Sequence, residues 1–298
     1  MKVIVTGGAG FIGSHLVDEL IFQGHEVAVI DNFSTGLKEN LNPKAVLYGL
    51  DISKDDLSVV DTAGVEVIFH LAARARIQPS IIDPEESHRH NVLGALRIFK
   101  LAADIGAKVV HSSSSSVYGV VTDMPDGGVT ESHQLAPKSP YALQKLMDEQ
   151  YLELMGTLYG LKWVAMRYFN VFGERQIKNG AYSTVIGTFL DQKEKGEDMT
   201  IVGDGEQRRD FTYVKDVVKA NIMCATSDAV NGQIFNIGTG KNYSINDIAA
   251  FIGGPTVNIP ARPGEAQITL ANNTKAKELL TWSPTVTVKE WLEGTPMV

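Results

Sequence analysis

The sequence predicts an α/β fold in which a doubly wound parallel sheet is combined with a smaller C-terminal domain. In the N-terminal half, short runs of β-branched residues alternate with longer amphipathic stretches. The strand-like runs are apolar throughout, as in strands that helices cover on both faces. After about residue 172 this regular alternation ends. Because connections between parallel strands are right-handed, a doubly wound sheet is the expected arrangement.

The expected elements follow one another in a clear order along the chain. In the N-terminal half we expect strands at 3–6, 27–30, 46–48, 67–70, 108–111 and 163–167, and helices at 11–22, 85–103 and 141–158. Further on we expect helices at 183–194, 214–226, 245–252, 275–280 and 288–292, and a strand at 234–237. The first domain should therefore comprise residues 1–172 with a return segment near 212–240, and the second residues 173–298.

The composition is that of a globular protein. Hydrophobic residues make up 44% of the 298 residues and charged residues 21%, which excludes disordered, collagen-like and coiled-coil proteins. Lys and Arg number 27 against 35 Asp and Glu, so the net charge is −8. Sequence-independent binding of nucleic acid needs clustered cations, and so we expect no nucleic-acid partner. Cys224 is the single cysteine, which excludes an intrachain disulfide and a multi-cysteine zinc site.

Neither membrane insertion nor metal binding is expected. No stretch approaches the ~18 uninterrupted apolar residues of a membrane span. Met1 and Lys2 lead directly into a strand, without the apolar run of a secretory signal, and this favours a cytoplasmic protein. His88 and His90 lie two apart on an expected helix, so they point to different faces and make a poor metal pair.

The turn between the first strand and the first helix is rich in glycine. Residues 6–13 read Thr-Gly-Gly-Ala-Gly-Phe-Ile-Gly. Gly7, Gly10 and Gly13 allow a tight turn and let backbone N–H groups reach a pyrophosphate at the helix N-terminus. Asp31 ends the second strand, where a carboxylate accepts hydrogen bonds from both ribose hydroxyls and repels a 2′-phosphate. The pattern predicts a Rossmann-type site for NAD.

Two further strand ends offer cofactor contacts. Asp51 and Ile52 follow the third strand, where an acid and an apolar residue can bracket an adenine ring. An aspartate that caps a helix over 53–60 is an equally good interpretation. The second group is Leu71, Ala72 and Ala73. Their small side chains allow the backbone to approach a flat cofactor, with ordinary close packing as the alternative.

A candidate catalytic group combines a serine-rich strand end with a helix. Tyr141 and Lys145 are four residues apart, so both project from one helix face. An ammonium near a phenol favours the phenolate, which makes Tyr141 a usable general base. Ser114 follows the fifth strand and can bond the substrate oxygen that reacts. A Tyr-x-x-x-Lys pattern alone also fits an exposed helix face, but the dinucleotide turn upstream favours catalysis.

At these residues the sequence resembles the extended short-chain dehydrogenases/reductases, and specifically the NAD-dependent sugar-nucleotide epimerase/dehydratase family. The resemblance runs the whole length and also covers residues 113–119, 167–173, 203–205, 209–211 and 262–265. It implies that Asn32 joins Asp31 at the cofactor ribose. It further implies cofactor contacts from Phe11, Ile12, Tyr141, Lys145 and Tyr168.

The resemblance also implies a set of substrate residues. Arg209 and Arg262 would hold the diphosphate of a UDP-sugar, with Asn170 beside it. A guanidinium suits phosphate, and a surface ion pair is the alternative. Glu265 would hold the nucleotide ribose, although the family often has aspartate there. Thr269 would flank the pocket near the C2 substituent of the sugar, with a solvent-facing strand residue as the alternative.

The activity that the resemblance implies is that of a UDP-hexose 4-epimerase, acting by transient oxidation at C4 with bound NAD. It would interconvert gluco- and galacto-configured UDP-sugars, N-acetylhexosamines included. A 4,6-dehydratase would need Asp-Glu where this chain has Ser115 and Ser116. A UDP-glucuronate 4-epimerase or decarboxylase stays open. An NAD-sensing module without chemistry is disfavoured, because Tyr141 and Lys145 are both present. A homodimer would form through the helices at 85–103 and 141–158.

Overall fold

The computed structural model describes residues 1–261 and 266–294. Its central feature is a sheet of seven parallel strands in the order β11-β6-β5-β4-β1-β2-β3. The strands are β1 Lys2–Thr6, β2 Glu26–Ile30, β3 Val46–Tyr48, β4 Val65–His70, β5 Lys108–Ser114, β6 Trp163–Tyr168 and β11 Gln233–Ile237. The chain builds outward from β1 in both directions, so the strand order reverses between β1 and β4. The predicted doubly wound parallel sheet is confirmed.

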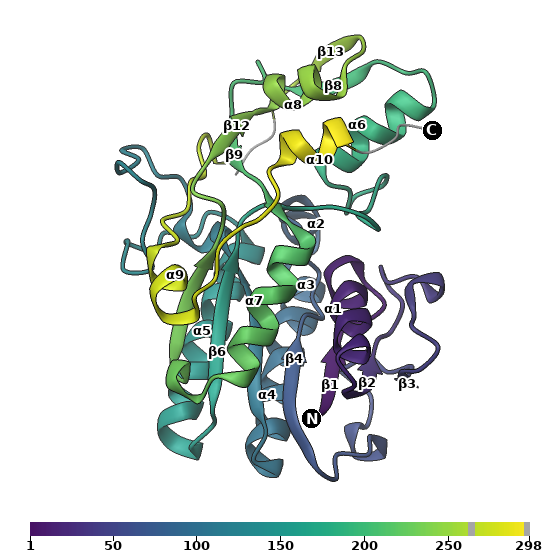
Figure 1. Ribbon diagram of the computed structural model, residues 1–298, viewed down its shortest axis with the longest axis vertical. Coiled ribbons are helices and arrows are strands. Elements are labelled where there is room, and N and C mark those ends of the chain that lie inside the picture. The colour runs from purple at the N-terminus through teal and green to yellow at the C-terminus, as the bar shows by residue number, and fades with distance from the viewer. Residues whose placement is uncertain (262–265, 295–298) are drawn as a thin grey trace.

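Helices cover both faces of this sheet (Figure 1). On one face α1 Phe11–Phe22 packs beside α7 Val214–Thr226, and on the other α4 Gly94–Ile105 packs beside α5 Pro140–Tyr159. Alternate residues of β1 point into the two resulting cores: Val3 and Val5 join one, and Ile4 joins the other. This is why the strands lack polar alternation and read as continuous apolar runs.

Local signals set the ends of α5, the helix that carries the candidate catalytic pair. The side chain of Ser139 accepts a hydrogen bond from the backbone N–H of Ala142 at 3.2 Å, and Pro140 occupies the first helical position. The helix ends at Gly160, which has the left-handed φ of 67° that glycine adopts easily. The helix therefore has Tyr141 in its first turn, near the carboxyl ends of the sheet strands.

In the first half of the chain, the main differences from the expectation concern three segments. The helix expected at 85–103 is divided into α3 Pro84–His88, a π-helical turn Arg89–Leu93, and α4. This wider turn spans five residues, too few to show as a change of period in the sequence pattern. The region 53–60 holds only a short 3₁₀ turn, Leu57–Val59, instead of a full helix. An unexpected helix, α2 Ile77–Ile82, follows the fourth strand.

The smaller upper part of the molecule has its own core (Figure 1). Its helices are α6 Val185–Glu194, α8 Ile245–Ile252 and α10 Val288–Gly294, and its parallel strand pair is β8 Met199–Val202 with β13 Thr256–Ile259. Phe189, Ile201 and Ile248 are among the residues that fill this core. Two further short pairs join β7 Val171–Phe172 to β10 Thr212–Tyr213, and β9 Arg208–Asp210 to β12 Asn242–Ser244.

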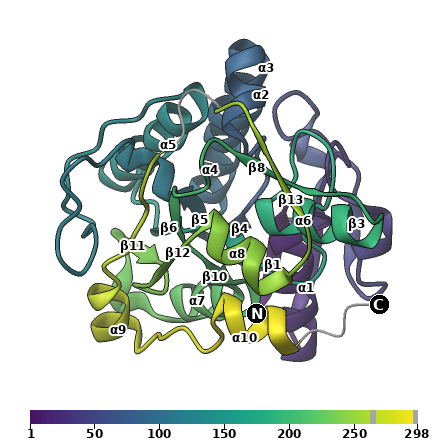
Figure 2. The same cartoon turned by 90° about the horizontal axis from the view of Figure 1, so that it is seen from above.

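The chain passes between the two parts several times. It leaves the sheet after β6, returns through α7 and β11, and leaves again through β12. The helix α9 Thr274–Leu280 then lies against β11, far from α10 (Figures 1 and 2). Trp282 is fully buried in the lower core, where its indole N–H donates to the carbonyl of Asp216 at 2.8 Å. Residues after 172 therefore contribute to both parts.

Candidate active site

A cavity of about 890 Å³ opens at the carboxyl ends of the strands, between the two parts of the chain. In doubly wound sheets, ligands bind at this edge where the strand order reverses. The residues expected at the site that line it are Gly7, Gly10, Phe11, Ile12, Gly13, Asp31, Asn32, Asp51, Ile52, Leu71, Ala72, Ala73, Ser114, Tyr141, Lys145, Tyr168, Asn170, Arg209 and Thr269. Arg262 and Glu265 lie outside the described residues.

The glycine turn after β1 is as tight as the sequence indicates. Gly7 adopts a φ of 73°, and its carbonyl accepts a hydrogen bond from the N–H of Gly10 at 3.1 Å. A Cβ atom on Gly13 would lie 2.1 Å from the Gly7 oxygen, and one on Gly7 would lie 2.8 Å from the Ala72 nitrogen. Glycine at these two positions thus permits the tight turn that brings the N-terminus of α1 to the cavity wall, where backbone N–H groups can bind a phosphate group.

Asp31 is fixed beside this turn. One carboxylate oxygen accepts from the N–H of Ala9 at 2.9 Å and the other from the N–H of Phe33 at 2.8 Å. Burial raises the pKa of Asp31, and these two hydrogen bonds oppose that rise. The carboxylate is therefore held in one orientation at the end of β2, on the wall of the cavity.

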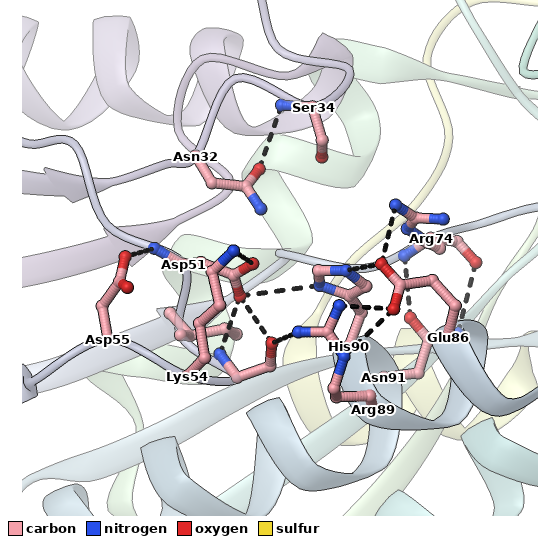
Figure 3. Close-up of polar contacts among 12 residues, drawn as sticks. Asn32, Ser34, Asp51, Lys54, Asp55, Arg74, Glu86, Arg89, His90 and Asn91 are labelled. Carbon is pink, nitrogen blue, oxygen red and sulfur yellow. Dashed lines mark hydrogen bonds and ion pairs between the residues drawn. The ribbon is translucent and has the colours of Figure 1, made fainter.

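Asp51 lies at the centre of a polar network at the end of β3 (Figure 3). It accepts from the backbone N–H and hydroxyl of Ser53 at 2.9 and 2.6 Å, and it lies 3.6 Å from His90. Burial raises the pKa of Asp51, but the hydrogen bonds from Ser53 and the nearby His90 outweigh it and bring the pKa to about 2. Asp51 closes a local turn, as in the capping interpretation, and also lines the cavity.

The same network continues to the loop after β4 (Figure 3). Glu86 accepts from His90 at 2.9 Å and pairs with Arg74 at 3.2 Å, while the backbone N–H of Arg74 donates to Asn91 at 2.7 Å. Hydrogen bonds from Arg89 and His90 lower the pKa of Glu86 to about 2. These contacts tie the loop that carries Ala72 and Ala73 to α3. Among the described residues no cluster could hold a metal ion.

The candidate catalytic side chains meet on one wall of the cavity. Ser114 ends β5, and its hydroxyl oxygen accepts from the N–H of Ser116 at 3.2 Å. The backbone N–H of Tyr141 donates to the hydroxyl of Ser80 on α2 at 3.1 Å, which fixes the start of α5. Lys145 is 2% exposed, and its ammonium lies 3.4 Å from Asp148.

Behind Lys145 lies a buried chain of polar groups. Asp148 is 3.5 Å from His111, whose ring stacks on that of His70 with centroids 5.4 Å apart. His70 is hydrogen-bonded to the hydroxyl of Thr6 at 2.7 Å. Burial raises the pKa of Asp148 to about 7, with Lys145 opposing it, and burial lowers the pKa of both histidines. The sequence analysis missed this chain, in which His70 at the end of β4 lies opposite His111 in the middle of β5.

The opposite wall comes from the upper part. Thr269 lies outside the strands and lines the cavity, so the solvent-facing interpretation is wrong. Its hydroxyl accepts from the amide of Asn170 at 3.1 Å and from the N–H of Asp210 at 3.1 Å. Arg209 donates to the carbonyl of Arg208 at 3.1 Å. Tyr168 also lines the cavity, and its hydroxyl is hydrogen-bonded to the buried Asn221.

Comparison with known proteins identifies the family. The model of the NAD dependent epimerase/dehydratase family matches residues 3–238. The chain belongs to this family. It is 40% identical to a putative UDP-glucose 4-epimerase of Methanocaldococcus jannaschii, over 98% of this chain and 96% of that one. The resemblance stated from the sequence is thereby confirmed.

Solved structures agree in fold and in length. A UDP-glucose 4-epimerase of Thermotoga maritima, solved with UDP-glucose, is 37% identical with a TM-score of 0.92, covering 98% of this chain and 96% of that chain. A UDP-N-acetylglucosamine 4-epimerase of Methanobrevibacter ruminantium, in complex with UDP-N-acetylmuramic acid, is 39% identical with a TM-score of 0.90, covering 99% and 96%.

The residues present fit the NAD on which the family depends. The tight turn that Gly7 and Gly13 permit presents the N-terminus of α1 to a pyrophosphate, and the fixed carboxylate of Asp31 suits a ribose with free hydroxyls. NAD is therefore the cofactor of this protein, as predicted. Within residues 1–261 and 266–294, no helix is long and apolar enough to cross a membrane.

Proposed function

We propose that this protein is a UDP-hexose 4-epimerase that interconverts gluco- and galacto-configured UDP-sugars, N-acetylhexosamines included. The observation that carries the proposal is the convergence of Ser114, Tyr141 and Lys145 on one cavity. The same cavity runs from the glycine turn to Arg209 and has room for both a dinucleotide and a nucleotide sugar. The relatives named as UDP-sugar 4-epimerases match nearly the whole chain.

The side chains divide the reaction among them. Tyr141 takes the proton of the 4-hydroxyl group, and the ammonium of Lys145 stabilises the resulting phenolate. Ser114 forms a hydrogen bond to the same sugar oxygen. NAD, when bound, supplies a reversible hydride acceptor for C4. The diphosphate, which we assign to Arg209, anchors the 4-keto sugar while the ring turns, so hydride returns to the other face.

The charges on the cavity wall support epimerisation over elimination of water. Elimination from C6 needs an acid/base pair beside the ring. Of the described lining residues, only Asp31 and Asp51 are acids, and they lie at the ends of β2 and β3. Ser115 and Ser116 follow the catalytic hydroxyl instead. Among the described residues, the 4-keto sugar therefore has no neighbouring carboxylate that could remove the C5 proton.

The size of Thr269 supports a wide substrate range. Two hydrogen bonds hold its hydroxyl at the cavity wall, and its small side chain leaves volume that a tyrosine ring would fill. We place the C2 substituent of the sugar there, so an acetamido group fits without a clash. Since the chemistry at C4 is unchanged, turnover should follow the fit of the sugar.

We further propose that residues 1–172, with the return segment 212–240, bind NAD and that most of 173–298 binds the UDP-sugar. We also propose a cytoplasmic homodimer. Support for the dimer comes from exposed leucines along α5: Leu143 is 44% exposed, Leu154 50% and Leu158 64%. Sedimentation analysis would give the mass of one chain if this assignment is wrong.

The test is incubation of the purified holoenzyme with UDP-glucose, UDP-N-acetylglucosamine and UDP-glucuronate, with products resolved by chromatography. We expect the 4-epimers of UDP-glucose and UDP-N-acetylglucosamine, without a requirement for added NAD, and UDP-glucuronate tests the third substrate class. The matched control is Tyr141→Phe, which keeps the ring but lacks the proton-transferring hydroxyl. A 4-keto-6-deoxy product, or a UDP-pentose from UDP-glucuronate as the sole product of the panel, would overturn the proposal.

A further inference from the structure

Arg76 differs from its neighbours because its guanidinium lines the cavity without an acidic partner. It lies between β4 and α2, and its Nε donates to the carbonyl of Tyr182 at 2.9 Å. Within residues 1–261 and 266–294, the structure places no carboxylate at ion-pair distance from it. Arginines that pair with a described carboxylate include Arg74, Arg89, Arg167, Arg175 and Arg208.

The side chain of Arg76 is half-buried on the cavity wall. Burial lowers the pKa of Arg76, and the phenol of Tyr141 is the group that raises it. A guanidinium has five N–H donors, and among the described residues the structure shows an acceptor for one of them, the Nε–H. A buried cation is unfavourable unless an anion and hydrogen bonds compensate it. Arg76 is therefore preorganised for an anion that enters the cavity close to Tyr141.

The charge distribution of the cavity supports this assignment. Arg76, which precedes α2, and Lys145 on α5 contribute positive charge to the cavity, and Arg74 and Lys138 also line it. The acids among the described lining residues, Asp31 and Asp51, follow β2 and β3 and not the strands that bear the catalytic side chains. A neutral hexose would leave the charge of Arg76 without compensation, whereas an anionic hexose would neutralise it.

We propose that Arg76 binds the C6 carboxylate of a UDP-hexuronate, so that the substrates of this enzyme include uronates; this rests on the 4-epimerase function proposed above. The 4-hydroxyl must meet Tyr141, and the carboxylate is borne by C5, the carbon next to C4. A cation beside Tyr141 is thus within reach of it. A planar guanidinium matches a carboxylate with two parallel hydrogen bonds.

Such an ion pair would also influence the outcome of the reaction. Oxidation of a uronate at C4 gives a β-keto acid, which loses CO₂ by breaking the C5–C6 bond. The electron pair of that bond moves to the C4 carbonyl as an enolate, and C5 is later protonated by water. Because the negative charge leaves the carboxylate in this step, a guanidinium paired with it stabilises the reactant over the enolate. Arg76 would thereby favour hydride return over decarboxylation.

The experiment compares the holoenzyme with Arg76→Gln and Arg76→Lys, using UDP-glucuronate and UDP-glucose. We expect Arg76→Gln to raise the calorimetric Kd and the KM for UDP-glucuronate at least tenfold. Because Arg76 lies beside Tyr141, the kcat/KM for UDP-glucose should also fall, but at least tenfold less than that for UDP-glucuronate, and Arg76→Lys should recover part of the affinity for UDP-glucuronate. The fraction of UDP-pentose product should rise in Arg76→Gln. Arg175→Gln, which removes an arginine paired with Asp18 outside the cavity, is the matched control.

Each other result has a definite meaning. Equal loss on both sugars, and on UDP alone, would assign Arg76 to the diphosphate and overturn the inference. The inference would also be overturned if Arg76→Gln bound UDP-glucuronate as tightly as the wild type does. Normal turnover of UDP-glucose in that case would leave the proposed epimerase intact. No turnover of any of these sugars would contradict the proposed function, and the Kd for UDP-glucuronate would still test Arg76.

Discussion

Replacing Asp148 with asparagine should remove a large part of the pH dependence of stability between pH 5 and pH 8. Burial raises the pKa of Asp148 to about 7, against the opposing charge of Lys145. His111 faces the carboxylate from β5, at 3.5 Å, and His88 acts on it from α3. In the unfolded chain an aspartate titrates at about 3.9. The folded state therefore binds the proton more tightly than the unfolded state does.

The sign and size of the effect follow from this difference in pKa. The favourable contribution of protonated Asp148 is complete below pH ~4 and is lost as the pH rises through about 7. A shift of about 3 pKa units corresponds to roughly 4 kcal/mol at the high-pH plateau, of which roughly 2 to 3 kcal/mol falls between pH 5 and pH 8. Asparagine carries no titrating proton, so the variant lacks this slope.

Urea unfolding at several pH values measures the effect directly. The free energy of unfolding of Asp148→Asn, relative to wild type, should increase by roughly 2 to 3 kcal/mol between pH 5 and pH 8. Asp123→Asn, a change at an exposed position, controls for the loss of a carboxylate in general. If the curves for wild type and Asp148→Asn run parallel across this range, the buried carboxyl group does not titrate as argued.

Four further changes test the cofactor and substrate sites. Gly13→Ala should abolish retention of NAD, because the added methyl group would lie 2.1 Å from the carbonyl oxygen of Gly7; NAD released by acid from the purified protein is the readout. Wild type should bind NAD far better than NADP by calorimetry, and Asp31→Ala should narrow that preference; equal affinities in wild type would refute the role of the carboxylate. Tyr141→Phe should lower kcat by ~10²–10⁴-fold while the Kd for UDP-glucose stays nearly constant; near-full activity would remove this hydroxyl from the mechanism. Thr269→Tyr should slow UDP-N-acetylglucosamine much more than UDP-glucose, and an equal loss on both would contradict the assigned pocket.

The elements of the main sheet could be predicted because each carries its own signal. β1 and α1 are joined by a glycine turn, and α5 begins with Ser139 and Pro140, so local chemistry sets their limits. The pair β8 and β13 was missed. Each strand has four residues, and the two strands, which pair with each other, lie far apart in the sequence. Neither is long enough to show a clear strand pattern by itself. The π-helical turn between α3 and α4 was missed because its five residues are too few to show a change of period.

The site divides in the same way. Gly13, Asp31 and the pair Tyr141 and Lys145 belong to short motifs, which are readable from the sequence alone. The buried acid behind Lys145 is Asp148, which lies beside His111 of β5. No sequence motif relates β5 to α5, so this contact is visible only in the structure. The sequence does not distinguish Arg76 from other arginines. Only the structure shows that no described carboxylate lies at ion-pair distance from it. Local motifs thus reveal the reaction, whereas the groups that tune it depend on tertiary contacts.

The late return of the chain to the sheet affects how the protein is made. β6 is buried over its whole length, yet its outer partner β11 follows α6, the first helix of the upper part, in the sequence. As the chain leaves the ribosome, β6 presents an unpaired apolar edge until residues 233–237 emerge. The lower core also waits for Trp282, close to the end of the described chain. The lower part therefore cannot finish folding before the rest of the chain is made. A nascent chain that stalls within the upper part would expose the unpaired edge of β6 to other nascent chains.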